Sequence, residues 1–177
     1  MRKYINSFSD KMKLYHQATY DHCVRVARLS KMIGCVIGLT ESELFYLFST
    51  GMLHDLGKTI IPVSVLEKPF TLNAVERALM LQHPKRGAQM LNCLDHLIPQ
   101  GVASHHEYWN GNGYPDRLRG ESIPLYSRII AIADAIDAMT EPRPYRTLYS
   151  FPRALKEVVD CAGLQFDPYI VHKIIPR

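Results

Sequence analysis

The sequence lacks several features that would place it in a specialised class of protein. It has no apolar run near the roughly 18 residues that a membrane-spanning helix needs, and its first residues, MRKYINSFSDKMKLYHQ, contain no apolar segment of a secretory signal. Its cysteines form no CxxC pair, which favours free thiols in a reducing compartment over a disulfide framework. We therefore expect a cytoplasmic protein without a membrane span.

A strong excess of one charge sign is also absent. The chain has 21 Lys and Arg against 17 Asp and Glu, a formal net charge of +4. Such a charge suits an anionic small ligand and is too small to predict binding to duplex nucleic acid. With 177 residues, 47% of them hydrophobic, the chain can bury a sizeable core, and we expect residues 1–177 to form a single domain.

Signals for β-strands are missing as well, since no run alternates and no hairpin turn is recognisable, so the fold is predicted to be all-α. Gly38 is expected to end the first helix, Thr40 and Glu43 form a capping box for the second, and Pro84 predicts a break at His83, the last residue of the third. The expected helices cover about residues 10–37, 41–55, 73–83, 85–93, 98–106, 125–139, 152–161 and 168–175, with at most a helical turn in 60–70.

One long segment, residues 108–124, is predicted to be irregular because glycine and proline recur along it. Seventeen residues make a long loop for a compact domain, and such loops are usually functional or disordered. The aromatic residues of this one favour a function. Its start overlaps the stretch HHEYWNGNGYP, in which two adjacent histidines precede the glycines.

Histidines and aspartates recur at the expected helix ends. Imidazoles and carboxylates that converge from separate helices can form a divalent metal site inside a helical bundle. His54 and Asp55 are adjacent, so on a helix they point about 100° apart. One metal could take both only if the helix end unwinds, whereas two metals bridged by Asp55 could use both. The candidate ligands are His22, His54, Asp55, His83, His105, His106 and Asp134.

Each candidate also has a structural explanation. A single helical histidine is more often a surface or hydrogen-bonded residue than a ligand, and that interpretation is kept for His16, His96 and His172. Asp134 interrupts the apolar stretch IIAIADAID, where a bare carboxylate is costly to bury, but it could pair with Arg128. Asp137 is expected to have a structural or supporting role. The metal hypothesis therefore depends on the joint pattern.

That pattern resembles the HD-GYP family, a branch of the HD-domain metal-dependent phosphohydrolases whose members hydrolyse the bacterial second messenger cyclic di-GMP. The resemblance covers about residues 20–170 and implies a helical bundle of the HD-domain type with a long irregular GYP loop. Relatives usually carry an attached sensor or receiver domain, and we expect none here. The matching motifs are HDLGK (54–58), HP (83–84), HHEYWNGNGYP (105–115), IP (123–124), SRIIAIADAIDAM (127–139), RPYR (143–146) and GLQFDP (163–168).

The resemblance implies two divalent metal ions per chain, iron or manganese. The first would be held by His22, His54, Asp55 and Asp134, and the second by His83, His105, His106 and a bridging Asp55. Some relatives bind a third metal through a glutamate four residues before the first histidine. Ala18 stands at that position, so two metals are expected.

The implied reaction is an in-line attack on phosphorus by a hydroxide held between the two metals. Asp55 would be catalytic as the bridge, and Lys58 would contact the phosphate and stabilise the developing charge. The expected product is linear pGpG, with further cleavage to GMP in some relatives.

Further substrate contacts are expected from the loop and from the segment after the last metal ligand. The arginines could instead form salt bridges, and the aromatic residues could anchor the loop in the core. Asn110 replaces an aspartate that relatives commonly have. The candidate substrate-binding residues are Lys58, Trp109, Tyr114, Arg143 and Arg146.

Two other functions stay open. One is a weakly active or inactive module that binds cyclic di-GMP or a signalling partner, such as a diguanylate cyclase, through the GYP loop. The other is a phosphohydrolase acting on a different cyclic dinucleotide or nucleotide. The complete ligand set favours catalysis, whereas Ala18 and Asn110 depart from the family pattern. The oligomeric state is not predicted.

Overall fold

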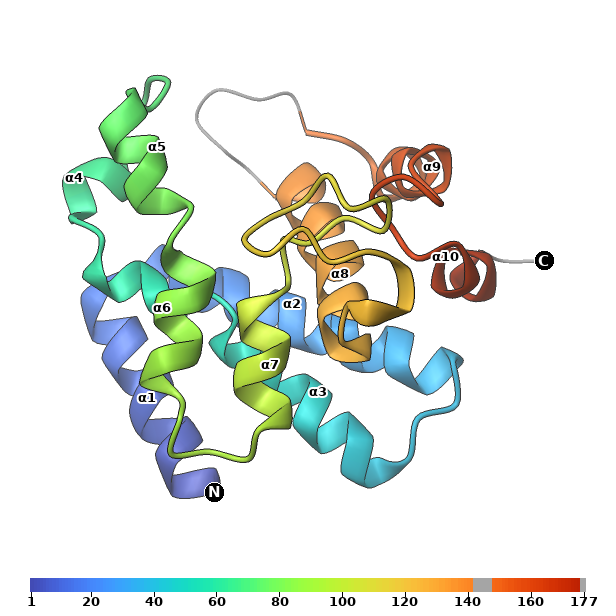
Figure 1. Ribbon diagram of the computed structural model, residues 1–177, viewed down its shortest axis with the longest axis horizontal. Coiled ribbons are helices and arrows are strands. Elements are labelled where there is room, and N and C mark those ends of the chain that lie inside the picture. Colours follow the sequence, from blue (N-terminus) through green and yellow to red (C-terminus); the bar gives the residue numbers. More distant parts are fainter. Residues whose placement is uncertain (142–147, 176–177) are drawn as a thin grey trace.

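Helices account for the regular structure of the residues that the computed structural model describes, 1–141 and 148–175 (Figure 1). Within these ranges there is no strand, only an isolated bridge between Ala162 and Phe166, which confirms the all-α prediction. In chain order the elements are α1 (Arg2–Tyr15), α2 (Gln17–Val36), α3 (Glu41–Leu53), η1 (Leu56–Ile60), α4 (Val63–Leu66), α5 (Ala74–Met80), α6 (His83–Met90), α7 (Leu97–Ala103), η2 (Gly120–Ser122), α8 (Leu125–Thr140), α9 (Phe151–Asp160) and α10 (Pro168–Ile174).

The prediction of one long N-terminal helix over residues 10–37 is wrong. Two helices, α1 and α2, meet at His16, whose backbone is extended (φ −154°, ψ 97°). His16 Nδ1 accepts a hydrogen bond from the Thr19 amide at 3.3 Å, so the imidazole caps α2. A histidine cap is uncommon, and periodicity alone cannot reveal it. The predicted stop at Gly38 and the capping box of Thr40 and Glu43 are confirmed.

Helix α2 connects two hydrophobic cores. It packs on α1, α3 and α8, and it crosses the molecule behind α7 and α8 in Figure 1. Val26 belongs to a core with Ile132 of α8, while Cys23 belongs to a second core with Leu53 of α3. A helix held on both sides in this way fixes the position of its polar residues relative to α3 and α8.

The break near Pro84 is confirmed, but its position corrects one detail of the prediction. Helix α5 ends at Met80, and His83 is the first residue of α6 rather than the last residue of the preceding helix. Proline is tolerated in the first turn of a helix because the amide there has no intrahelical partner. Likewise α7 ends at Ala103, so His105 and His106 lie beyond it.

The loop between α7 and α8 is irregular apart from η2, as predicted. Backbone hydrogen bonds tie it to the segment before α10: the Trp109 amide donates to the Gln165 carbonyl at 3.0 Å, and the Asn110 amide donates to the Leu164 carbonyl at 2.9 Å. Its position is therefore defined by contacts distant in sequence. Among all the residues that the structure describes, no helix is both long and apolar enough to cross a bilayer.

Candidate metal centre

The His54–Asp55 doublet lies where α3 ends. His54 still has helical angles (φ −57°, ψ −35°), but Asp55 leaves them (φ −98°, ψ 9°) before η1 begins. This unwinding brings His54 Nε2 within 3.5 Å of Asp55 Oδ2, although the two side chains would diverge on a continuous helix. Both residues are 1% exposed. The helix end thus turns two adjacent side chains toward one space.

Gly57 brings η1 against the first turn of α6. A Cβ atom at this position would lie 2.0 Å from the His83 carbonyl oxygen and 2.7 Å from the Gly87 amide, so a side chain cannot be accommodated. The close approach places His83 Nε2 3.2 Å from Asp55 Oδ1. The glycine of HDLGK therefore has a geometric role in joining His83 to the doublet.

One half of the site, the carboxylate cluster, consists of His22, His54, Asp55 and Asp134. His22 Nε2 lies 3.1 Å from Asp134 Oδ1 and 3.6 Å from Asp55 Oδ2. Ligand atoms of His22, His54 and Asp55 all fall within 4.8 Å of one another, so they could hold a metal ion. Residues from α2, the end of α3 and α8 are thereby brought together.

The other half, the histidine cluster, consists of His83, His105 and His106, whose ligand atoms also lie within 4.8 Å of one another. His83 Nδ1 donates to the Met80 carbonyl at 2.8 Å, and His105 Nδ1 donates to the Val102 carbonyl at 2.7 Å. A neutral imidazole has one N–H, so this bond leaves each Nε2 with a free lone pair. These two Nε2 atoms face each other at 3.2 Å.

The donor set fits a divalent cation. Two lone pairs facing each other need an electrophile between them, and His54 Nε2 and Asp55 Oδ1 have no hydrogen-bond partner among the described residues although both are buried. Buried polar atoms are normally satisfied, so such orphans call for a ligand. Mixed imidazole and carboxylate donors suit first-row divalent metals.

The histidines of the site differ in their protonation. Burial lowers the pKa of His105 and His54 and lowers that of His106 to about 3, so these imidazoles are neutral. Burial opposes the charge of His22 too, but hydrogen bonds to Asp134 and Asp137 outweigh it and raise the pKa of His22 to about 9. Of these four histidines, only His22 would have to lose a proton before it could bind a metal at neutral pH.

The carboxylates are ionised. Burial would raise the pKa of Asp55, but Lys58 and the neighbouring imidazoles hold it well below its ordinary value. Asp134 also has a lowered pKa, because the attraction of His22 exceeds the cost of burial. Two ionised carboxylates therefore accompany a set of mostly neutral imidazoles, which is the protonation state that a cation requires.

Asp137 supports His22 from behind. The His22 Nδ1–H donates to Asp137 Oδ2 at 2.7 Å, which turns Nε2 toward the site. Arg25 holds the same carboxylate through two hydrogen bonds, from Nε at 2.7 Å and from Nη2 at 3.0 Å. The sequence indicated a supporting role for Asp137 but did not reveal its connection to His22 and Arg25. The pairing of Asp134 with Arg128 is not found, since Arg128 binds Asp167 at 2.6 Å.

Lys58 lies beside the metal candidates. Its Nζ donates to Asp55 Oδ2 at 2.6 Å, and the ion pair raises the lysine pKa against the effect of burial. The ammonium group is charged, and the lysine side chain as a whole is a quarter exposed. Its expected contact with a phosphate stays a prediction, and any such contact would share the lysine with Asp55.

Of the other candidate substrate contacts among the described residues, Tyr114 packs directly on a candidate metal ligand. Its ring stacks on that of His106, with centroids 4.9 Å apart and planes at 26°, and the Tyr114–Pro115 bond is cis. Trp109 lies under the Arg128 guanidinium, 5.8 Å from its ring centroid, which favours a loop anchor. Arg143 and Arg146 lie outside the described residues.

The two departures from the family pattern are also placed. Ala18 is exposed on α2, one turn before His22. Asn110 Oδ1 accepts the Asn112 amide at 3.0 Å, so it stabilises a turn in the loop. One residue that sequence reasoning missed is Glu107, which follows the histidine pair directly and is 2% exposed. The signal available in the sequence was an acidic residue directly after two candidate ligands.

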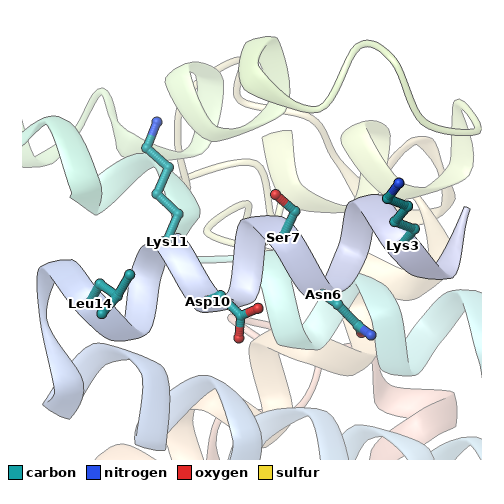
Figure 2. Close-up of a pocket in the computed structure, with 6 residues that line it drawn as sticks. All are labelled: Lys3, Asn6, Ser7, Asp10, Lys11 and Leu14. Carbon is teal, nitrogen blue, oxygen red and sulfur yellow. The ribbon is translucent and has the colours of Figure 1, made fainter.

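A depression elsewhere on the surface does not contribute to this site. It lies on the outer face of α1, and all its lining residues come from that helix (Figure 2). None of them belongs to either cluster. The lining residues are Lys3, Asn6, Ser7, Asp10, Lys11 and Leu14.

Comparison with known proteins shows to which family the chain belongs. The profile of the HD domain family matches residues 6–170. The chain belongs to the HD domain family. The resemblance drawn from the motifs is thereby confirmed, and the clusters described above occupy the HD doublet and the positions expected around it.

The chain is similar to two curated bacterial proteins. It is 34% identical over 98% of its length to the 3'3'-cGAMP-specific phosphodiesterase 2 of Vibrio cholerae, and 37% identical over 85% to the cyclic di-GMP phosphodiesterase response regulator RpfG of Xanthomonas campestris. It spans 34% and 41% of those proteins.

A solved structure of the V. cholerae cyclic GMP-AMP phosphodiesterase V-cGAP3 superimposes with a TM-score of 0.70 at 26% identity. The match covers 96% of this chain and 46% of that one. The helical architecture of the HD domain is therefore shared along almost the whole chain.

Proposed function

We propose that this chain is the catalytic domain of a phosphodiesterase that hydrolyses cyclic di-GMP. The observation that carries the proposal is the meeting of the two clusters at Asp55, whose Oδ1 faces His83 at 3.2 Å and whose Oδ2 faces His22 at 3.6 Å. A carboxylate with one oxygen toward each cluster could bridge two cations, which supports the proposal. The relatives' activities on cyclic dinucleotides support the substrate class.

The metal-holding roles follow from the clusters. His22, His54, Asp55 and Asp134 would hold one ion, and His83, His105, His106 and Asp55 the other, with iron or manganese as the metals. When bound, such a pair of ions lowers the pKa of a coordinated water and offsets the charge of a phosphodiester.

Lys58 would contact the phosphate group of the substrate and stabilise its negative charge. Its ammonium group is held 2.6 Å from Asp55 Oδ2, so it is fixed beside the carboxylate where the phosphodiester would lie. A fixed cation stabilises charge that develops on a phosphoryl oxygen. Tyr114, which covers His106, would border the same space and could contact a guanine base. Arg143 and Arg146 are proposed to contact the ligand from the neighbouring segment.

A specific observation favours a second substrate. The relative that covers 98% of the chain is named for 3'3'-cGAMP rather than cyclic di-GMP. Both ligands are cyclic dinucleotides with two phosphodiester bonds, so the same metal centre could serve either. The base-contacting residues would decide between them, and Arg143 and Arg146 are among the candidates.

The experiment is a substrate panel. The full chain, loaded with Mn²⁺ or with Fe²⁺ without oxygen, is incubated with cyclic di-GMP, 3'3'-cGAMP and cyclic di-AMP, and products are separated by chromatography. We expect pGpG, and GMP on longer incubation, from cyclic di-GMP. Faster turnover of 3'3'-cGAMP would move the assignment to the second substrate. A fully metallated protein that cleaves none of the three would refute the phosphodiesterase proposal.

A further inference from the structure

Glu107 is a buried carboxylate satisfied by main-chain amides. It follows His105 and His106 in the sequence and is 2% exposed. Its Oε1 accepts the Asp116 amide at 2.6 Å, and its Oε2 accepts the Leu118 amide at 3.1 Å. Among the described residues, no Lys, Arg or His side chain forms an ion pair with Glu107. The Asp116 and Leu118 N–H groups are the hydrogen-bond donors that stabilise its buried carboxylate.

Those amides lie on the part of the loop that returns toward the site. Gly113 passes so near the start of the loop that an added Cβ would lie 2.2 Å from the Tyr108 amide and 2.5 Å from Glu107 Cα. The Tyr114 amide donates to the His106 carbonyl at 3.1 Å. The loop is thus folded back on Glu107, and both of its arms meet there.

This folding determines where the Tyr114 ring lies. The ring stacks on His106, a residue of the histidine cluster, with centroids 4.9 Å apart. Asp116, held by Glu107, comes two residues after Tyr114, so the carboxylate fixes the backbone from which the ring projects. The two N–H groups bind different oxygens of the carboxylate, and in glutamine one of those oxygens is replaced by an NH₂ donor, so one N–H group would lose its acceptor.

We propose that Glu107 is a positioning residue that connects the GYP loop, residues 108–124, to the metal centre. It holds the returning arm so that Tyr114 packs on His106 and keeps that imidazole turned toward its metal. The inference deepens the proposed function, because it assigns His106 to the reaction site. Glu107 itself contacts neither substrate nor metal in this role.

The test uses Glu107→Gln, which keeps the shape of the side chain and removes one acceptor. Trp109 is the only tryptophan in the chain and lies in this loop, so its fluorescence reports on the loop directly. With one buried N–H left unsatisfied, we expect loop cleavage by a protease to become about tenfold faster and Trp109 to become easier to quench with acrylamide. Glu121→Gln, an exposed acid in η2 of the same loop, is the matched control and should change neither.

A metal readout separates positioning from simple loosening. Equilibrium dialysis against Mn²⁺ should show weaker binding of one of two ions in Glu107→Gln, while far-UV circular dichroism stays unchanged. Tyr114→Leu should weaken the same ion, and the double variant should be no worse than Tyr114→Leu alone, because both act through one contact. Additive losses would overturn the proposed route through Tyr114.

Two further results would overturn the inference. One is a Glu107→Gln protein with the proteolysis, quenching and Mn²⁺ binding of the wild type. The other is rapid hydrogen exchange of the Asp116 and Leu118 amides in the wild-type protein, a measurement that needs no variant. None of these readouts uses turnover. An inactive wild type would therefore refute the phosphodiesterase proposal and leave the role of Glu107 to be decided separately.

Discussion

The carboxylate cluster and the histidine cluster share Asp55, but they are built in different ways. His22 in the first is oriented by Asp137, which lies 115 positions away in the sequence, and is charged in the absence of metal because its pKa is raised to about 9. His83 and His105 in the second are each oriented by a carbonyl three residues earlier. The orientation of His22 depends on the packing of α2 against α8, whereas His83 and His105, like His54 of the first cluster, are oriented locally by carbonyls at helix ends.

This difference has consequences for how the halves would fail. A change in the packing of α2 against α8 should disturb the carboxylate cluster first, because Asp137, which orients His22, lies on a separate helix. The histidine cluster should tolerate such a change but respond to the GYP loop, since Tyr114 packs on His106. Because Asp55 belongs to both clusters, a change that displaces it would affect both halves of the site.

Replacing Asp55 should have the largest effect, because it removes the group common to both halves. Asp55→Ala is expected to lower turnover of cyclic di-GMP at least about 1000-fold, since groups that act as a unit lose their effect together. Metal analysis should show loss of both ions. Asp10→Ala, an exposed aspartate on α1, is the control and should behave as the wild type. Unchanged turnover in Asp55→Ala would refute the bridging role.

Replacing His105 should separate the halves. His105→Gln is expected to leave one metal ion per chain and to lower turnover about 100-fold or more, because the remaining half cannot clamp the phosphate alone. The measurement is metal content after gel filtration, beside the turnover assay. His96→Gln replaces an exposed histidine and serves as the control. Retention of two ions would show that His105 is not a ligand.

Asp137→Asn should weaken the carboxylate cluster alone. An asparagine oxygen can still accept the hydrogen bond from His22. The negative charge that makes the imidazole a stronger metal ligand is lost, however. Loss of such a supporting group typically costs 10–100-fold in metal affinity, and we expect about that decrease for one ion. Mn²⁺ titration measures it, with Asp160→Asn as the exposed control. Equal weakening of both ions would contradict the separation of the halves.

The release of protons on metal binding is the smallest expected effect, and it compares the protonation of His22 directly with that of His106. At pH 7 His22, with its pKa raised to about 9, holds a proton that a cation must displace, whereas His106, with its pKa lowered to about 3, holds none. Metal loading should release about one proton. Calorimetry in two buffers of different ionisation enthalpy measures it, and a release near zero or above two would contradict these protonation states.

The same shifts predict opposite pH responses. A raised histidine pKa stabilises the metal-free fold below the ordinary value of 6.5, and this stabilisation disappears as pH rises through about 9. A lowered pKa, as in His106, destabilises the fold as pH falls below 6.5. Thermal melts of the metal-free protein from pH 5 to pH 10 would show both trends.

Much of this molecule was predictable where the signal is local. The capping box at Thr40, the stop at Gly38 and the break before Pro84 are set by residues adjacent in the sequence, and all three were confirmed. The break at His16 was missed, because a histidine side chain caps α2 there and the apolar period continues across it. Local chemistry was visible, but an unusual cap was not.

The candidate site was predictable by residue type but not by connection. The order of histidines and aspartates indicated which side chains converge, and the structure brings all seven candidate ligands together. The pairing of Lys58 with Asp55 and of His22 with Asp137, and the role of Glu107 in the loop, depend on side-chain directions in the folded chain. Spacing in the sequence does not specify those directions.

The most direct measurement is a metal titration followed by turnover. Metal-free protein receives increasing Mn²⁺, and cleavage of cyclic di-GMP is recorded at each step together with the bound metal. If the two halves act through Asp55 as a unit, activity should stay low after the first equivalent and reach its plateau at two ions per chain. A plateau at one ion, a requirement for three, or a fully loaded protein without turnover would contradict that arrangement.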